Sequence, residues 1–259
     1  MKTLRLSIAA FLLLAVFSCK KDNNSSSASV TSDQAADIAA SSLASNSYGV
    51  TSMTDAVASN AQGLASIGSS QSVNSLGVSE HHQECGTTLT DSATFSGSSS
   101  SVTFDYFVKY SHTLNCNVNA QPDNIVNALT YHGNFDGPRV TTAATGTANA
   151  TIAGLTAGAT NFVINGEYKR QGSFTSKVGN KASGNSDIDI VVTNLLLSKP
   201  GRHIVSGTAT ITVTGSTSKG GSFSYTGNLL FNGDGTATLT VTGGASYVIN
   251  LDSGDCKKH

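Results

Sequence analysis

The stretch SFSYTGNLLFNGDGTATLTV, residues 222–241, decides the fold class of this chain. Its first ten residues alternate, and one side of the alternation carries Phe223, Tyr225, Gly227, Leu229 and Phe231. Successive side chains of a strand point to opposite faces, so the alternation predicts a strand with one buried and one wet face. The letters NGDG then supply a turn before a second alternating run, which makes the whole segment a β-hairpin.

The same period of two recurs from about residue 85 onward. SVTFDYFVKY (101–110) and DIDIVVTNLLL (187–197) are the clearest examples. In the second run the predicted inward row is Ile188, Ile190, Val192, Asn194 and Leu196. Turn signals such as GSSSS and KPGR separate the runs, and no helical pattern lies between them. The sequence therefore predicts a mainly β domain of about ten antiparallel strands in a meander, forming a strongly curved sheet, a half-barrel or a barrel.

Five of these strands place a glycine in the inward row. They are Gly133, Gly146, Gly166, Gly207 and Gly227. Glycine weakens a strand, so its repeated inward position needs a physical cause. A strongly coiled sheet kinks at inward glycines, and aromatic side chains of neighbouring strands then cover them. Alternatively, the glycines leave room for a ligand against the sheet. In both cases we expect the glycines to lie close together on a curved sheet.

A helical signal precedes the β domain at residues 31–67. TSDQ (31–34) and SMTD (52–55) both have the spacing of a capping box. Apolar residues then recur at helical spacing and would share one face of each helix. We expect a short helical segment broken at NSYG, followed by a linker at 68–84 and the β domain at 85–256. A disordered Ala/Ser-rich linker over the helical segment is the alternative.

The N-terminus carries a targeting signal. Lys2 and Arg5 precede the apolar run LSIAAFLLLAVF (6–17), which is too short for a mature membrane-spanning helix and typical of a secretory signal. The run ends in VFSC, with Ser18 directly before Cys19. This pattern resembles the lipobox of Bacteroidota-type outer-membrane lipoproteins, and Val16 departs from the leucine that is commoner three positions before the cysteine.

The resemblance implies a location for the protein. In that family the signal (1–18) is removed and the thiol of the cysteine, here Cys19, carries a diacylglycerol that anchors the protein to the membrane. Lys20 at the second mature position favours the outer membrane, and residues 19–30 would form a flexible tether. The rest of the chain is similar to lipoproteins of that group that share an Ala/Ser-rich start, ECG before the first strand and a terminal F-x-G-x-G-x-A hairpin; this likeness implies no activity.

The stretch HHQECG (81–86) contains the first of three cysteines that remain after lipidation, which are Cys85, Cys116 and Cys256. A hairpin centred near residue 99 would bring Cys85 nearly opposite Cys116. Because the expected compartment is oxidising, we expect a disulfide between these two cysteines. It would close a loop of about 30 residues and stabilise the fold by roughly 3.5 kcal/mol. Cys256 would remain a free thiol or an intermolecular partner.

Two other roles for this cysteine are conceivable. A zinc site could combine its thiol with His81, His82, His112 and His132, although paired short-spaced ligands are missing. Cys85 could also act as a nucleophile with one of the adjacent histidines as its base. Both roles need a free thiol, which the disulfide would consume. We therefore predict no metal site and no catalytic cysteine.

Charge and motifs limit the function classes. From Cys19 onward the chain carries 13 basic and 16 acidic residues without a basic stripe, which argues against nucleic-acid binding. Asp187 and Asp189 share a strand face, where such pairs are usually solvated surface charges. No nucleophile elbow, zinc-protease motif, P-loop or dinucleotide fingerprint occurs. No catalytic or cofactor-binding residue is therefore predicted.

These observations predict a non-enzymatic lipoprotein of the cell envelope. Its β domain would bind a ligand or partner, such as an envelope protein, a glycan or an apolar ligand, and no cofactor. The alternative is a structural or adhesion module of the cell surface without a small-molecule site, and a hydrolase with an unrecognised site is the third possibility. An enclosed apolar cavity would favour ligand carriage, whereas a filled core with an exposed apolar patch would favour partner binding.

Overall fold

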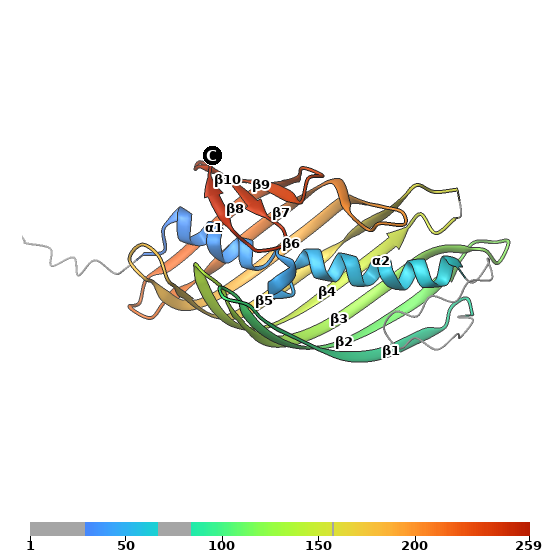
Figure 1. The fold of residues 1–259 in the computed structure, drawn as a ribbon, viewed down its shortest axis with the longest axis horizontal. Helices are drawn as coiled ribbons and strands as arrows, with labels where there is room; N and C mark the ends of the chain where they lie inside the picture. Colours follow the sequence, from blue (N-terminus) through green and yellow to red (C-terminus); the bar gives the residue numbers. More distant parts are fainter. Residues whose placement is uncertain (1–28, 67–83, 157) are drawn as a thin grey trace, which may run out of the picture.

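A single antiparallel sheet dominates the computed structural model, which describes residues 29–66, 84–156 and 158–259. Its eleven strands follow one another in chain order, and each strand is hydrogen-bonded to the next (Figure 1). The strands are β1 (Thr88–Ser98), β2 (Thr103–Cys116), β3 (Pro122–Asp136), β4 (Val140–Ala153), β5 (Asn161–Ser176), β6 (Ser183–Ser198), β7 (Ile204–Thr217), β8 (Ser222–Phe231), β9 (Thr236–Val241), β10 (Ser246–Asn250) and β11 (Cys256–Lys258). The predicted antiparallel meander is confirmed. The first and last strands are not paired in the described segments, so the sheet is not a closed barrel.

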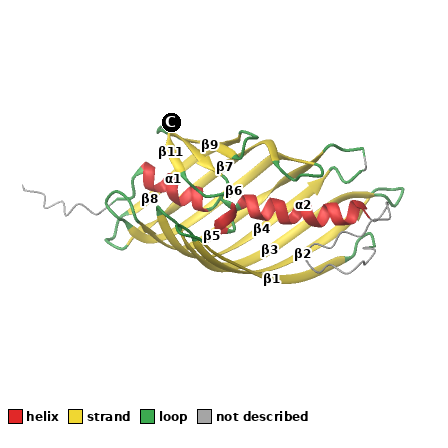
Figure 2. Ribbon diagram, in the orientation of Figure 1, coloured by secondary structure: helices red, strands yellow, loops and turns green. Residues whose placement is uncertain are grey.

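Helices precede the sheet, as the sequence predicts. They are α1 (Ser32–Ser41), the 3-10 turn η1 (Ser45–Ser47) and α2 (Val50–Ser66). Both α-helices lie across the same face of the sheet, α1 beside β4, β7, β10 and β11 and α2 beside β4 and β5 (Figures 1 and 2). We call this the covered face and the opposite one the open face. The predictions for the signal peptide, Cys19, most of the tether and most of the second linker concern residues outside the described part of the chain.

Helix α1 begins with the predicted capping box. The hydroxyl of Thr31 accepts a hydrogen bond from the Gln34 N–H, and the Gln34 side chain accepts one from the Thr31 N–H, each at 3.2 Å. Gln34 also donates to the carbonyl oxygen of Val178 at 3.1 Å, so the same residue joins the helix to the sheet. The second expected cap is wrong, because Ser52 lies inside α2 and its hydroxyl donates to the carbonyl oxygen of Ser45 at 2.7 Å.

Large side chains of the helices and the covered face fill the space between them. The most completely buried are Tyr106, Tyr168, Tyr247, Phe162, Phe174 and Phe231 from the sheet and Ile38, Leu43 and Met53 from the helical segment. Removing this much apolar surface from water is the main source of stability. The helical segment is therefore part of the core, because without it one whole face of the sheet would be exposed.

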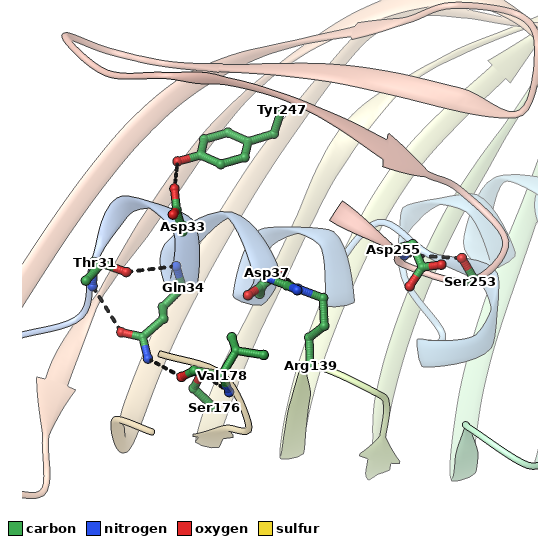
Figure 3. Close-up of polar contacts among 10 residues, drawn as sticks. All are labelled: Thr31, Asp33, Gln34, Asp37, Arg139, Ser176, Val178, Tyr247, Ser253 and Asp255. Carbon is green, nitrogen blue, oxygen red and sulfur yellow. Dashed lines mark hydrogen bonds and ion pairs between the residues drawn. The ribbon is translucent and has the colours of Figure 1, made fainter. Parts of the chain in front are cut away.

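Polar contacts fix the position of α1 over the sheet (Figure 3). Arg139 Nε lies 2.6 Å from Asp37 Oδ1, and only 2% of the Asp37 side chain is exposed. The Tyr247 hydroxyl donates to Asp33 Oδ1 at 2.6 Å, and Lys258 approaches the same oxygen at 3.1 Å. Burial raises the pKa of Asp37 despite its ion pair, whereas the hydrogen bonds from Tyr247 and Lys258 lower the pKa of Asp33.

The inward row predicted for β6 is wrong from Asn194 onward. This residue is exposed and left-handed, with φ 49°, and the register with β7 shifts around it. The Asn165 side chain of β5 accepts a hydrogen bond from the Asn194 N–H at 2.8 Å. The extra residue of this β-bulge reverses the alternation, so Leu195 and Leu197 face the core in place of Leu196.

The bulge also changes the neighbouring part of β7. Val205, which the alternation places inward, is 44% exposed. Gly207 has φ 152°, and a Cβ atom there would lie 2.7 Å from the Cα atom of Leu195. Glycine is therefore required at this position by both its backbone conformation and the close approach of β6.

Candidate functional site

The predicted disulfide between Cys85 and Cys116 is confirmed, with a Cα–Cα distance of 5.6 Å. The β1–β2 register pairs Thr88 with Thr113 and places the turn at residues 99–102, slightly later than expected. If the same register is extended past Thr88 and Thr113, away from the turn, Cys85 lies directly opposite Cys116. The bridge therefore closes the hairpin in register and excludes a free nucleophile at Cys85.

The remaining thiol is buried in the last strand. Cys256 is 8% exposed, and burial raises its pKa to about 12. A thiol with such a pKa is protonated at neutral pH and a poor nucleophile. His81 and His82 lie outside the described residues. Among the residues that the structure describes, no group of three or more His, Cys, Asp or Glu side chains could hold a metal ion.

Arg170 is a buried cation on the covered face. Its guanidinium donates to the carbonyl oxygen of Ser41 at 2.6 Å and to the Thr142 hydroxyl. Ser41 is the last residue of α1, and the carbonyl end of a helix carries partial negative charge. Arg170 therefore caps the helix from the sheet, and this contact gives the buried cation a structural role.

Tyrosines occupy the space between the helical segment and β2, β3 and β5. The hydroxyl oxygens of Tyr131 and Tyr168 lie 2.5 Å apart, and Tyr168 donates to the carbonyl oxygen of Tyr48 at 3.2 Å. The ring of Tyr48 packs within 5.8 Å of the rings of Tyr106 and Tyr131. Burial raises the pKa of Tyr106 to about 12. These tyrosines are buried and pack the space between the helical segment and the sheet.

Two of the five predicted inward glycines lie under aromatic rings. A Cβ atom at Gly133 would lie 2.4 Å from the Tyr106 ring, and one at Gly146 would lie 2.4 Å from the Tyr131 ring. Each ring belongs to the residue directly opposite its glycine in the register. At Gly166, Gly207 and Gly227 the nearest side chains are instead the aliphatic ones of Ala150, Leu195 and Leu239. The aromatic cover expected from the sequence is thus present at the first two positions.

Gly133 also belongs to a row of small residues that crosses the sheet. Successive cross-strand partners in this small-residue row are Gly133, Ala144, Gly172, Ser186 and Gly215. A Cβ atom at Gly172 would lie 2.1 Å from the carbonyl oxygen of Ala143, so no larger residue fits there. The small-residue row cannot be recognised in the sequence, because its members are not regularly spaced along the chain.

A groove of about 600 Å³ opens on the open face above the small-residue row. Gly133, Ala144, Gly172 and Ser186 line its floor, and exposed side chains of β2 to β6 line its sides. Two cross-strand rows on the open face border it: Phe107, His132, Thr145, Gln171 and Asp187 form one, and Asp105, Asn134, Ala143, Ser173 and Asn185 form the other. None of the large core side chains lines it.

A second lobe of about 310 Å³ continues the groove toward the β3–β4 turn and shares Asp105, Asn134 and Ala143 with the first. We call both lobes together the outer groove. Where they meet, Asn134 Nδ2 donates to both carboxylate oxygens of Asp105 at 3.2 Å. This contact fixes the orientation of both side chains at the junction of the lobes.

The outer groove is acidic and amide-rich. Asp105, Asp136 and Asp187 are its carboxylates, and no lysine or arginine is among the residues that line either lobe. Asp136 is paired with Lys177 at 2.6 Å. Asp187, expected to be a solvated surface charge, is exposed and lines the first lobe. Its strand neighbour Asp189 lies outside the groove.

An aromatic ring stands beside the first lobe. Phe107 is 40% exposed, and its ring centroid lies 5.3 Å from that of His132, which lines the lobe. Exposed aromatic rings are costly in water and commonly serve as contact surfaces. The outer groove thus combines carboxylates, amides and hydroxyls with an exposed aromatic ring beside its first lobe, and Phe104 and Phe135 line part of its second lobe.

Comparison with known proteins gives no relative. No family model matches the chain, and no match was found among curated proteins or solved structures. In the described residues, no helix combines the length and the apolar character needed to cross a membrane. The function must therefore be argued from the residues of this chain alone.

Proposed function

We propose that this protein is a non-enzymatic lipoprotein, anchored to the outer membrane through Cys19, whose β domain binds a ligand or partner. The VFSC pattern and the preceding apolar run support the anchor. The observation that carries the binding role is the outer groove, an open polar groove on a sheet whose opposite face is occupied by the chain's own helices. We also propose that the open sheet is strongly curved, in the manner of a half-barrel.

A second candidate is a structural or adhesion module that acts through strand pairing. The observation that favours it is β1, an eleven-residue strand at the edge of the sheet. Edge strands of this length can pair with a strand of another chain. Such a module would function without occupation of the outer groove.

Lipidation is tested by expressing the chain in a bacterium with the lipoprotein pathway and labelling it with an alkyne fatty acid. We expect the wild-type chain to incorporate the label and to fractionate with outer membranes. The Cys19→Ala variant should lose both properties, whereas Cys256→Ala should keep them. Label on the Cys19→Ala variant, or wild-type chain in the soluble fraction, would contradict the anchor.

A further inference from the structure

We propose that the outer groove binds a neutral polysaccharide, with several sugar units lying across strands β2 to β6. This inference rests on the proposed function, because it assigns a ligand class to the groove that carries that function.

The groove is elongated and open. Its first lobe crosses five neighbouring strands, which at about 4.8 Å per strand spacing corresponds to about 19 Å. The second lobe adds about 310 Å³ to the 600 Å³ of the first. Small side chains at Ala143, Thr145 and Ser173 keep the bordering rows low where they cross β4 and β5. An extended chain fits this shape, whereas a compact small molecule would leave most of it empty.

The polar groups of the groove suit hydroxyl-rich ligands. A sugar hydroxyl both donates and accepts hydrogen bonds, and side-chain amides do the same. Asn134, Gln171 and Asn185 provide such amides, and Asp105 and Asp187 provide carboxylates that accept from hydroxyls. Hydrogen bonds to a charged acceptor are stronger than those between neutral groups.

Phe107 supplies the remaining element of sugar recognition. One face of a pyranose ring is formed by C–H groups and packs against a flat aromatic surface. Phe107 is exposed on the same face of β2 as Asp105, and its ring lies beside His132. A chain in the groove would therefore meet a stacking surface at one end and hydrogen-bonding groups along its length.

The same residues disfavour other ligand classes. An anionic polymer would meet the carboxylates of Asp105 and Asp187 without a lysine or arginine among the lining residues. An extended peptide binds best by main-chain pairing at a sheet edge. Here the main chain of β3, β4 and β5 is paired on both sides, so only side chains are available. A lysine-rich peptide attracted by the carboxylates is the competing outcome.

The test is binding of the full chain, purified in a non-glycosidic detergent, to a microarray of neutral oligosaccharides and to dextran, xylan and laminarin in affinity gels. We expect at least one of these glycans to be bound. Phe107→Ala and Asn134→Ala should each weaken that binding about tenfold or more. The controls are Leu230→Ala and Asn228→Ala, which remove an exposed apolar and an exposed amide side chain from β8 and should leave binding unchanged.

Three results would overturn the inference: no binding to any neutral glycan, binding that the groove variants leave intact, or competition by decalysine with no competition by free oligosaccharide. If Asn134→Ala fails to fold, Gln171→Ala takes its place. A chain that is lipidated and membrane-bound but binds no glycan refutes this inference and leaves the proposed anchor intact. A chain that binds a glycan but is not lipidated refutes the proposed anchor and leaves the glycan inference intact.

Discussion

At the scale of single residues, the free thiol of Cys256 illustrates how burial controls reactivity. The thiol is 8% exposed, and burial together with nearby Asp37 raises its pKa to about 12. In a Cys19→Ser variant we expect no reaction with Ellman's reagent at pH 8 over minutes in the folded protein. One thiol should react at once in guanidinium chloride. Rapid reaction of the folded protein would show that β11 opens readily.

Gly172 tests the close approach of strands in the small-residue row. A Cβ atom there would lie 2.1 Å from the Ala143 carbonyl oxygen, so alanine forces β4 and β5 apart. We expect Gly172→Ala to lower the free energy of unfolding by about 1–3 kcal/mol in urea titrations. Gly158→Ala is the matched control, because nothing lies within 4 Å of its added atom. Equal stability of the two variants would refute the close approach.

At the scale of elements, α1 is held to the last strands by a contact that depends on pH. Hydrogen bonds from Tyr247 and Lys258 lower the pKa of Asp33 below its ordinary 3.8. A carboxyl group with a lowered folded-state pKa stabilises the fold above its unfolded pKa and loses this effect as the pH falls through the folded value.

We therefore expect the free energy of unfolding of the wild type to fall more steeply below pH 4 than that of Asp33→Asn. Urea titrations between pH 6 and pH 2 measure the difference, and Asp252→Asn serves as a control for an exposed aspartate. Parallel curves for wild type and Asp33→Asn would show that the contact adds nothing to stability.

The elements themselves could be predicted because their signals are local. Alternation in residues 222–231 and the capping box at Thr31 each depend on a few neighbouring positions. The bulge at Asn194 could not be predicted, because it is supported by Asn165, which lies 29 positions earlier on another strand. The expected cap at Ser52 was wrong because α2 already begins at Val50, shortly after η1.

At the scale of the whole molecule, the disulfide was predictable and the outer groove was not. The two cysteines flank one hairpin, so a single turn fixes their partnership. The groove forms only when five strands are paired in the correct register. At the junction of its two lobes, Asp105 of β2 lies opposite Asn134 of β3. No residue of the groove forms a motif along the chain, so only the folded sheet reveals it.

The disulfide should contribute to the stability of the whole fold through the unfolded chain. It closes a loop between residues 31 positions apart, which in the chain-entropy treatment corresponds to roughly 3.5 kcal/mol. Cys85 is exposed and Cys116 is half-buried at the edge of the core, so serine in their place removes only part of one side chain's packing. In a Cys19→Ser/Cys256→Ser background, which leaves no other thiol for reshuffling, the double variant Cys85→Ser/Cys116→Ser should lower the free energy of unfolding by about this amount.

Urea titration measures the loss, and treating the disulfide-bonded parent with a reductant should reproduce it. As the matched control, reductant should leave the free energy of unfolding of the double variant unchanged. The outer groove is built from β2 to β6, and β1 lies outside it. We therefore expect the variant to keep any ligand binding at temperatures where it remains folded. A decrease in the free energy of unfolding of less than about 1 kcal/mol would show that residual hairpin structure already restricts the unfolded chain.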